Sequence, residues 1–228
     1  AASDVYKRQH LKMTRPLVSV SNVTLIGNGP FDKRDLNLSK TLAPFIVAAD
    51  GGANALHHTS TKAEAIIGDM DSVSKETIKL YPMAKRYKIK CQDTTDFEKC
   101  LGLIKAPKLL GVGFLEGRLD HQLANLSALV KFPNQKCILI GLTDICFLCP
   151  EEFSISLPIK TAISIYPMGA TSGSSKGLKY PIDNCNLDPS RKVGTSNEVI
   201  SKVKLQFKER LILIILSKKY LTNVLEVL

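Results

Sequence analysis

The sequence predicts an α/β fold, in which a Rossmann-like domain with a parallel sheet is followed by a small all-β sandwich or barrel domain. In the first half, short and wholly apolar segments end at Asp or Gly and lead into helical patterns, as expected of strands buried on both faces of a parallel sheet. From about Cys137 onward, short strand candidates alternate with Gly, Pro, Ser and Asp, and regular helical periodicity is missing.

The chain of 228 residues suits one large domain or two small ones, and it can bury a substantial core. The change of pattern predicts a domain boundary near Pro150. We therefore expect an α/β domain over residues 13–150 and a β domain over residues 151–228. Residues 1–12 lack the apolar segment of a signal peptide and are expected to be a non-native or disordered leader, with Met13 as the start.

The first half repeats one scheme of strand, polar turn and helix. Its first β-rich segment stops at Gly27-Asn28-Gly29-Pro30, a turn signal. Ser74 can cap one helix, and either Thr95 or Asp96 can cap another. The expected strands are 17–26, 45–49, 65–67 and 108–114, and the expected helices follow residues 52, 74 and 95 and cover residues 120–130.

The second half contains short strand candidates only. Ser172-Gly173-Ser174-Ser175 is interpreted as a loop. Cys146 and Cys149 have the spacing of a metal-ligand pair, but without a matching second pair we expect reduced, buried thiols. The expected strands are 137–142, 145–148, 153–157, 162–166, 203–207 and 211–216.

The composition excludes several classes of protein. The net charge is +10, and the basic run of residues 75–90 is interpreted as a solvated helix face and loop. Trp is absent and aromatic residues make up 6%, which argues against stacked-base recognition, so no nucleic-acid partner is expected. The sequence contains no run of about 18 apolar residues, so no membrane span is predicted. The six cysteines do not form the framework of a small secreted domain, and a cytoplasmic location is expected.

Five aspartates gather in four clusters of the first half, each beside Gly, Ser, Thr or Asn. Acidic residues gathered on turns of a basic protein call for a compensating cation, and Mg²⁺ that carries phosphates suits such a site. Ligands of open α/β sheets bind outside the carboxyl ends of the strands, where these clusters are expected. The aspartates are Asp50, Asp69, Asp71, Asp96 and Asp120.

Asp69 and Asp71 form the sharpest pair. Residues two apart in an extended segment point the same way, and two such carboxylates repel each other unless a cation or proton lies between them. The alternative is an Asp-rich surface turn with Asx hydrogen bonds. Asp50 with its following glycines could cap a helix or let backbone N–H groups approach phosphate. Asp96 could equally be a helix cap or a ligand.

Arg118 beside a glycine could clamp a phosphate in a bidentate manner, or it could form a surface ion pair with Asp120. His121 could act as a base, but it starts an apolar helical stretch, which favours a structural hydrogen bond.

The order of these motifs resembles the thiamine pyrophosphokinase family. In the second half, residues 164–169, 177–182 and 194–198 are similar to the family's thiamine-binding β domain. The resemblance covers about residues 17–216. The matching acidic segments are Asp50-Gly51-Gly52-Ala53-Asn54, Gly68-Asp69-Met70-Asp71-Ser72, Gln92-Asp93-Thr94-Thr95-Asp96 and Gly117-Arg118-Leu119-Asp120-His121.

The resemblance implies a transferase that moves the diphosphoryl group of ATP to thiamine and releases AMP and thiamine diphosphate. It implies that residues 13–150 bind ATP and Mg²⁺ and that residues 151–228 bind thiamine, in a homodimer with active sites at the subunit interface. Asp69, Asp71 and Asp96 would hold Mg²⁺. The catalytic residues would be Asp71, Asp96, Arg118 and Asp120. The substrates would be bound by Asp50, Gly51, Gly52, Asn54, Gln92, Thr95, Ser196 and Asn197.

The resemblance leaves the general base open between Asp96 and Asp71. The chain departs from the family pattern at Glu116, which adds a carboxylate near the phosphate site, and in the loop of residues 184–193. Residues 217–228 match no part of the pattern. The alternatives are a Mg²⁺-dependent nucleotide phosphohydrolase, a non-catalytic protein that binds thiamine or a nucleotide, and an RNA-binding module that only the charge suggests.

Overall fold

The computed structural model describes residues 15–57, 59–183 and 185–228. These residues divide into two compact units, unit 1 up to Ala128 and unit 2 from Leu129 to Leu228. The leader expected at residues 1–12, and Met13, lie outside the described residues. None of the described helices is long and apolar enough to cross a membrane.

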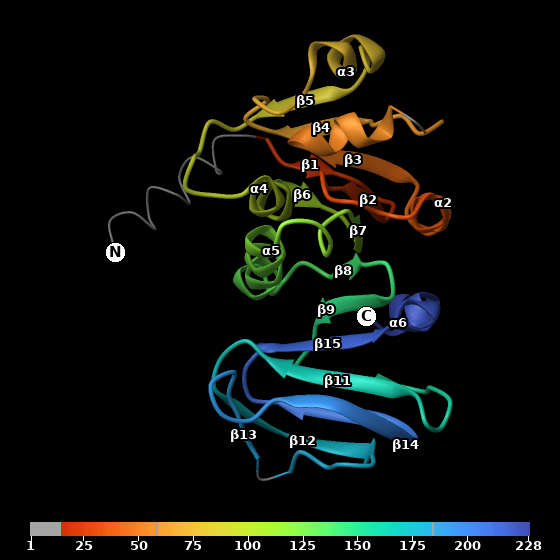
Figure 1. Ribbon diagram of the computed structural model, residues 1–228, viewed down its shortest axis with the longest axis vertical. Helices are drawn as coiled ribbons and strands as arrows, with labels where there is room; N and C mark the ends of the chain where they lie inside the picture. Colours follow the sequence, from red (N-terminus) through yellow and green to blue (C-terminus); the bar gives the residue numbers. More distant parts are fainter. Residues whose placement is uncertain (1–14, 58, 184) are drawn as a thin grey trace. The chain divides into compact units, whose positions relative to one another are not determined.

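Unit 1 is built on parallel strands, drawn from red to green in Figure 1. Three parallel pairings join most of these strands: β2 pairs with β7, and β4 pairs with both β3 and β5. β3 lies beside β2. Every residue of β2, β4 and β7 is buried, as expected of strands covered on both faces. The strands are β1 (Leu17–Val18), β2 (Val23–Ile26), β3 (Phe45–Ala49), β4 (Ala65–Gly68), β5 (Lys85–Lys88), β6 (Ile104–Lys105) and β7 (Leu109–Val112).

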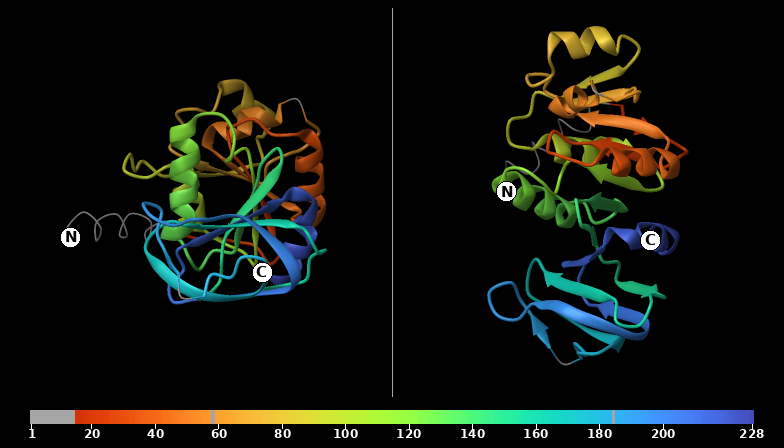
Figure 2. Two further views of the ribbon diagram at one scale, coloured as in Figure 1. Left: turned by 60° about the horizontal axis from the view of Figure 1, so that its bottom comes forward. Right: turned by 45° about the vertical axis from the view of Figure 1, so that its right-hand side comes forward.

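Three helices of unit 1, α2, α3 and α4, start where a side chain accepts a hydrogen bond from a free backbone N–H group. Asp32, Ser74 and Thr95 are these caps, and Thr95 forms a full capping box with Glu98. Figures 1 and 2 show α2 and α5 on opposite sides of the strands. The helices are α2 (Lys33–Leu42), the 3₁₀ helix η1 (Asp50–Leu56), α3 (Lys75–Leu80), α4 (Asp96–Leu103) and α5 (Leu119–Lys131).

Two expectations for unit 1 are wrong. Residues 17–26 are not one strand, because the Ser19 hydroxyl donates to the Ser21 carbonyl oxygen (2.8 Å) and turns the chain between β1 and β2. The basic run of residues 75–90 is not only helix and loop, since Lys85–Lys88 forms β5, which among the described strands pairs with β4 alone. Charged side chains suit such an edge strand, and they give it no apolar pattern in the sequence.

Unit 2 is antiparallel, with strands in the order β8, β9, β15, β11, β14, β12 and β13. The long strand β14 pairs with β11 through its first residues and with β10 and β12 through its last ones. It thereby joins two groups of strands. The strands are β8 (Cys137–Ile140), β9 (Asp144–Leu148), β10 (Glu152–Ile155), β11 (Ala162–Pro167), β12 (Thr171–Leu178), β13 (Asn186–Leu187), β14 (Gly194–Phe207) and β15 (Ile212–Ser217).

The core of unit 2 contains the expected thiols. Cys146 and Cys149 are buried with the ring of Phe147, which packs on Phe153 at 5.5 Å between centroids. Burial raises the pKa of Cys146 to about 12, so this thiol stays protonated at neutral pH. Both cysteines therefore contribute apolar packing.

Two further expectations are wrong in unit 2. Ser172 to Ser175 lie in β12, where Ser175 pairs with Leu205 and accepts a hydrogen bond from the Ile182 N–H. β12 consists mostly of small and polar residues, whereas its partner β14 buries Val199, Val203, Leu205 and Phe207. The second half also contains helices, η2 (Lys218–Tyr220) and α6 (Leu221–Val227), and α6 buries Leu221 and Val224.

Candidate active site

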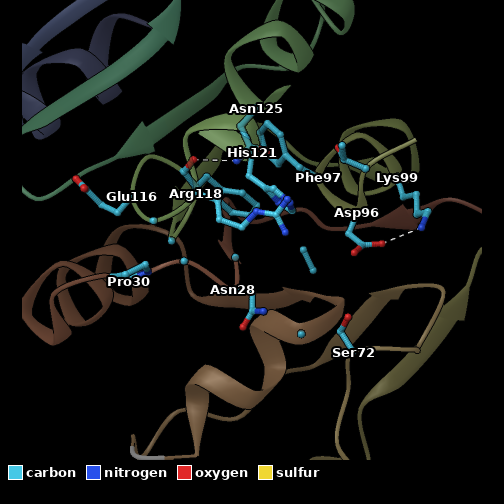
Figure 3. Close-up of a pocket in the computed structure, with 18 of the residues that line it drawn as sticks. Asn28, Pro30, Ser72, Asp96, Phe97, Lys99, Glu116, Arg118, His121 and Asn125 are labelled. Atoms are coloured by element: carbon cyan, nitrogen blue, oxygen red, sulfur yellow. Dashed lines mark hydrogen bonds and ion pairs between the residues drawn. The ribbon is translucent and has the colours of Figure 1, made fainter. Parts of the chain in front are cut away.

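A cavity of about 580 Å³ lies in unit 1 at the carboxyl ends of β2, β3, β4 and β7. The chain runs from β2 through β3 and β4 to β5 on one side, and β7 pairs on the other side of β2. The cavity is therefore at a switch point of the sheet, the usual ligand position in open α/β folds. Figure 3 shows side chains from these turns and from α4 and α5 around it.

Two glycines allow the turns to approach each other. Gly113 has φ of +79°, and a Cβ there would lie 2.7 Å from the Gly27 carbonyl oxygen. A Cβ on Gly68 would lie 2.5 Å from the Cβ of Asp50. Any side chain at either position would force the turns of the cavity apart.

Asp50 is fully buried at the start of η1, with φ of +40°, a region that non-glycine residues seldom adopt. Its carboxylate accepts hydrogen bonds from the N–H groups of Met70 (3.0 Å) and Ser72 (3.1 Å), so it orders the turn after β4. Burial raises the pKa of Asp50 to about 6, and the neighbouring aspartates contribute to the rise. The backbone of Asp50, in a sparsely populated conformation, thus holds a buried carboxyl group whose pKa is raised.

Asp50, Asp69 and Asp71 each place one carboxylate oxygen within 4.8 Å of the other two. The expected pair of Asp69 and Asp71 is thus brought together, and the Asp71 N–H donates to Asp69 Oδ1 at 3.3 Å. Three hard oxygen donors at this spacing fit a divalent cation such as Mg²⁺ or Ca²⁺. Asp69 and Asp71 line the cavity and Asp50 is buried next to them, so a metal ion held by this group would lie at the cavity.

Asp96 lines the same cavity, but it is paired with Lys99 and is not part of that group of three carboxylates. Lys99 Nζ lies 2.9 Å from Asp96 Oδ1 and 3.1 Å from Asp69 Oδ2 (Figure 3 shows the Asp96 pair). Burial opposes the charge of Lys99, but the two carboxylates outweigh it and raise the Lys99 pKa. Sequence reasoning missed Lys99, because one lysine in a helix carries no signal of burial.

Burial raises the pKa of both carboxylate partners of Lys99, but the net pKa shifts have opposite directions. For Asp96, burial outweighs the lowering effect of the ammonium group, and the pKa rises. For Asp69 the hydrogen bonds from Lys99 and the Asp71 N–H exceed the effect of burial, and the pKa falls. Asp69 is therefore the more persistently charged carboxylate.

Thr94 and Thr95 both line the cavity, but their hydroxyls have different environments. The Thr95 hydroxyl accepts from the Glu98 N–H (3.2 Å) as the cap of α4. The Thr94 hydroxyl oxygen is buried and has no hydrogen-bond partner within the described ranges. The sequence pointed to Thr95, whereas the group that lacks a partner belongs to Thr94.

Arg118 lines the cavity, and its guanidinium forms a bidentate pair with the exposed Asp120 at 3.1 and 2.5 Å. This is the surface ion pair that we considered, from the sequence, as the alternative to a phosphate clamp. Arg118 lowers the pKa of Asp120. His121 faces the cavity, while the Glu116 side chain points away from Asp96 and Lys99 (Figure 3).

Four residues that the sequence predicted to bind substrates do not line the cavity. Asn54 accepts from the Ser74 N–H (3.0 Å) and donates to the Ser72 carbonyl (2.7 Å), so it braces the turn after β4. Gln92 is exposed and outside the cavity lining, and Gly52 packs on the backbone of β2. In unit 2, the Asn197 amide clamps the backbone of Tyr180 at 3.1 and 2.7 Å.

Gly51 lines the cavity next to Asn28, a residue that the sequence placed only in a turn. Ser196 is exposed in unit 2 with φ of +59°, and its N–H donates to the Ser164 hydroxyl at 3.2 Å.

Comparison with known proteins agrees with this geometry. Two family models match, "Thiamin pyrophosphokinase, catalytic domain" over residues 37–140 and "Thiamin pyrophosphokinase, vitamin B1 binding domain" over residues 152–212. A rice protein, Thiamine pyrophosphokinase 1, is 31% identical over 67% of this chain and 71% of its own length. The chain belongs to the thiamine pyrophosphokinase family.

Other thiamine pyrophosphokinases match to a similar extent. Thiamin pyrophosphokinase 1 of Caenorhabditis elegans is 30% identical over 75% of this chain and 78% of its own length. The crystal structure of thiamin pyrophosphokinase from Geobacillus thermodenitrificans superposes with a TM-score of 0.71 at 22% identity, over 88% of this chain and 97% of that one. This chain is accordingly a kinase of the family that forms thiamine diphosphate from ATP and thiamine.

Proposed function

We propose that the diphosphoryl transfer from ATP to thiamine takes place at the cavity of unit 1. The observation that carries this proposal is the group of three carboxylates, Asp50, Asp69 and Asp71, at the switch point of a parallel sheet. Oxygen donors of this kind suit a divalent ion that carries phosphates. AMP leaves when the thiamine hydroxyl attacks the β-phosphorus of ATP.

We further propose that the divalent ion is Mg²⁺, held by Asp69 and Asp71 with Asp50 behind them. When bound, the ion neutralises charge on the transferring phosphate oxygens. Arg118 approaches the phosphates by exchanging its surface pair with Asp120 for an equivalent bidentate contact. Asp96 faces the cavity with a raised pKa, and it is our choice of proton acceptor for the thiamine hydroxyl.

In the finer architecture, we propose that residues 13–150 form the Rossmann-like ATP domain and residues 151–228 the thiamine-binding β-sandwich. Ser196 offers an exposed hydroxyl for thiamine, and Asn197 supports it by holding the backbone of the neighbouring strand. By analogy with the family we propose a homodimer in which this β domain serves the site of the partner subunit. The six cysteines are free thiols, which supports a cytoplasmic location.

The proposal is tested by measuring AMP release from ATP and Mg²⁺ with and without thiamine, together with mass detection of thiamine diphosphate. We expect AMP release that requires thiamine, and one thiamine diphosphate for each AMP. Release of AMP or ADP that is independent of thiamine would instead indicate a nucleotide phosphohydrolase. Tight binding of ATP or thiamine without turnover would indicate a binding protein.

A further inference from the structure

The cavity contains a positive charge of its own. Lys99 projects from α4 with only 3% of its side chain exposed, and its ammonium group bridges Asp69 and Asp96. These two carboxylates lie 30 and 3 residues away from Lys99 in the sequence. Lys99 therefore joins the turn after β4 to the first turn of α4.

The position of this ammonium group is fixed by the helix that carries it. The Thr95 capping box sets the first turn of α4, and the Phe97 ring packs on Phe114 with 4.5 Å between centroids. Lysine is a flexible side chain with three donors, and here it is held by burial and two carboxylates. Leaving such a buried charge without its partners is strongly unfavourable, so the three groups are held together.

The contacts of Lys99 are those that a metal ion would make. Asp69 presents one oxygen to Lys99 and the other to the Asp71 N–H, beside the group of three carboxylates. Without Lys99, Asp69 and Asp96 would be two partly buried carboxylates facing the same point. Such a pair would attract a cation of its own.

We propose that Lys99 is a built-in cation of the active site, and that its ammonium group occupies the place between Asp69 and Asp96 where a second divalent ion would otherwise bind. The free chain consequently binds one divalent ion, at Asp50, Asp69 and Asp71. Lys99 is a positioning residue, because it acts on the reaction through the orientation of Asp69 and Asp96. This inference rests on the metal site of the proposed function.

The test is a titration of the full chain with Mn²⁺ alone, without nucleotide, in which free Mn²⁺ is measured by electron paramagnetic resonance. We expect one ion per chain for the wild type and two for Lys99→Met, which keeps the length of the side chain and removes its charge. Lys99→Arg retains the charge and should bind one ion. Lys99→Met combined with Asp96→Asn removes the second pair of carboxylates and should also return to one ion.

One bound ion for Lys99→Met, with the dissociation constant of the wild type, would overturn the inference and leave the proposed function standing. No bound ion for the wild type would contradict the metal site itself. If Lys99→Met does not fold, as judged by its thermal melt, Lys99→Gln gives the same comparison. An unchanged ion count for a folded Lys99→Gln would overturn the inference equally.

Discussion

The hydroxyls of two neighbouring threonines have different roles: that of Thr95 is structural, and that of Thr94 is available to a ligand. Thr95 caps α4, whereas the buried Thr94 oxygen lacks a partner among the residues described. Buried polar groups are nearly always hydrogen-bonded, so an atom of this kind in a cavity wall indicates that a ligand completes it.

Replacing these threonines one at a time should give opposite results. Thr95→Ala should lower the free energy of unfolding by about 1 kcal/mol through loss of the cap. Thr94→Val should leave that free energy nearly unchanged and raise the KM for ATP by up to about 10-fold, the value of one hydrogen bond. Denaturant unfolding and steady-state kinetics measure the two effects. A destabilised Thr94→Val with an unchanged KM would contradict the assignment.

Asp50 should make the binding of Mg²⁺ depend on pH. Its folded pKa of about 6 is above its ordinary value, so the folded state binds the extra proton and Asp50 favours folding less as the pH rises toward 6. A divalent ion needs the deprotonated carboxylate, and its stabilising effect should therefore increase between about pH 5 and pH 7. Thermal melts with and without Mg²⁺ measure this increase. In Asp50→Asn the stabilisation by Mg²⁺ should no longer depend on pH over this range. An equal pH dependence in both proteins would count against the role of Asp50.

Four of the five aspartates could be predicted from the sequence because they follow an apolar strand and its turn, whereas Asp96 follows the polar strand β5. Lys99 and Thr94 could not be predicted, because their roles depend on burial between segments far apart in the chain. Asn54 and Asn197 show the opposite error, in which a motif residue predicted to bind a ligand has a structural role. Their motif positions suggested ligand contacts, whereas their amides satisfy backbone groups of the fold.

At the scale of elements, periodicity and capping located most of the helices and strands. Ser74 begins a helix as predicted, and of the two candidate caps of α4 it is Thr95 that forms the cap. The apolar strands β3 and β4 end at the expected aspartates. The elements that escaped prediction, such as β5 and β12, are polar and depend on pairing with a more apolar neighbour. Such pairing is a tertiary effect and leaves no local pattern.

The turn that joins β4 to the carboxylate group should not tolerate a side chain at Gly68. Because the new Cβ would meet Asp50 at 2.5 Å, we expect Gly68→Ala to cost about 1–3 kcal/mol of stability and to weaken Mg²⁺ binding. Gly102→Ala, within helix α4, is the control and should be neutral or stabilising by up to about 1 kcal/mol. Equal stabilities of the two variants, measured by urea unfolding, would show that the turn can relax.

At the scale of the whole molecule, the change from apolar strands and helices to short alternating strands predicted an α/β part followed by a β part. The structure contains a parallel unit and an antiparallel unit in that order. The sequence could not predict how β14 joins two groups of strands, because its 14 residues pair with three different strands along one extended run. The net charge of +10 favours the approach of an anionic nucleotide to this molecule.

The central claim is that the carboxylate group of unit 1 performs the transfer, and Asp71→Asn tests it most directly. The measurement is thiamine-dependent AMP release by Asp71→Asn, with Asp144→Asn in unit 2 as a control that changes an exposed aspartate elsewhere. We predict that Asp71→Asn lowers kcat by about 100-fold or more with an unchanged thermal melt, and that Asp144→Asn retains the wild-type rate. Near-normal turnover by Asp71→Asn would contradict the account.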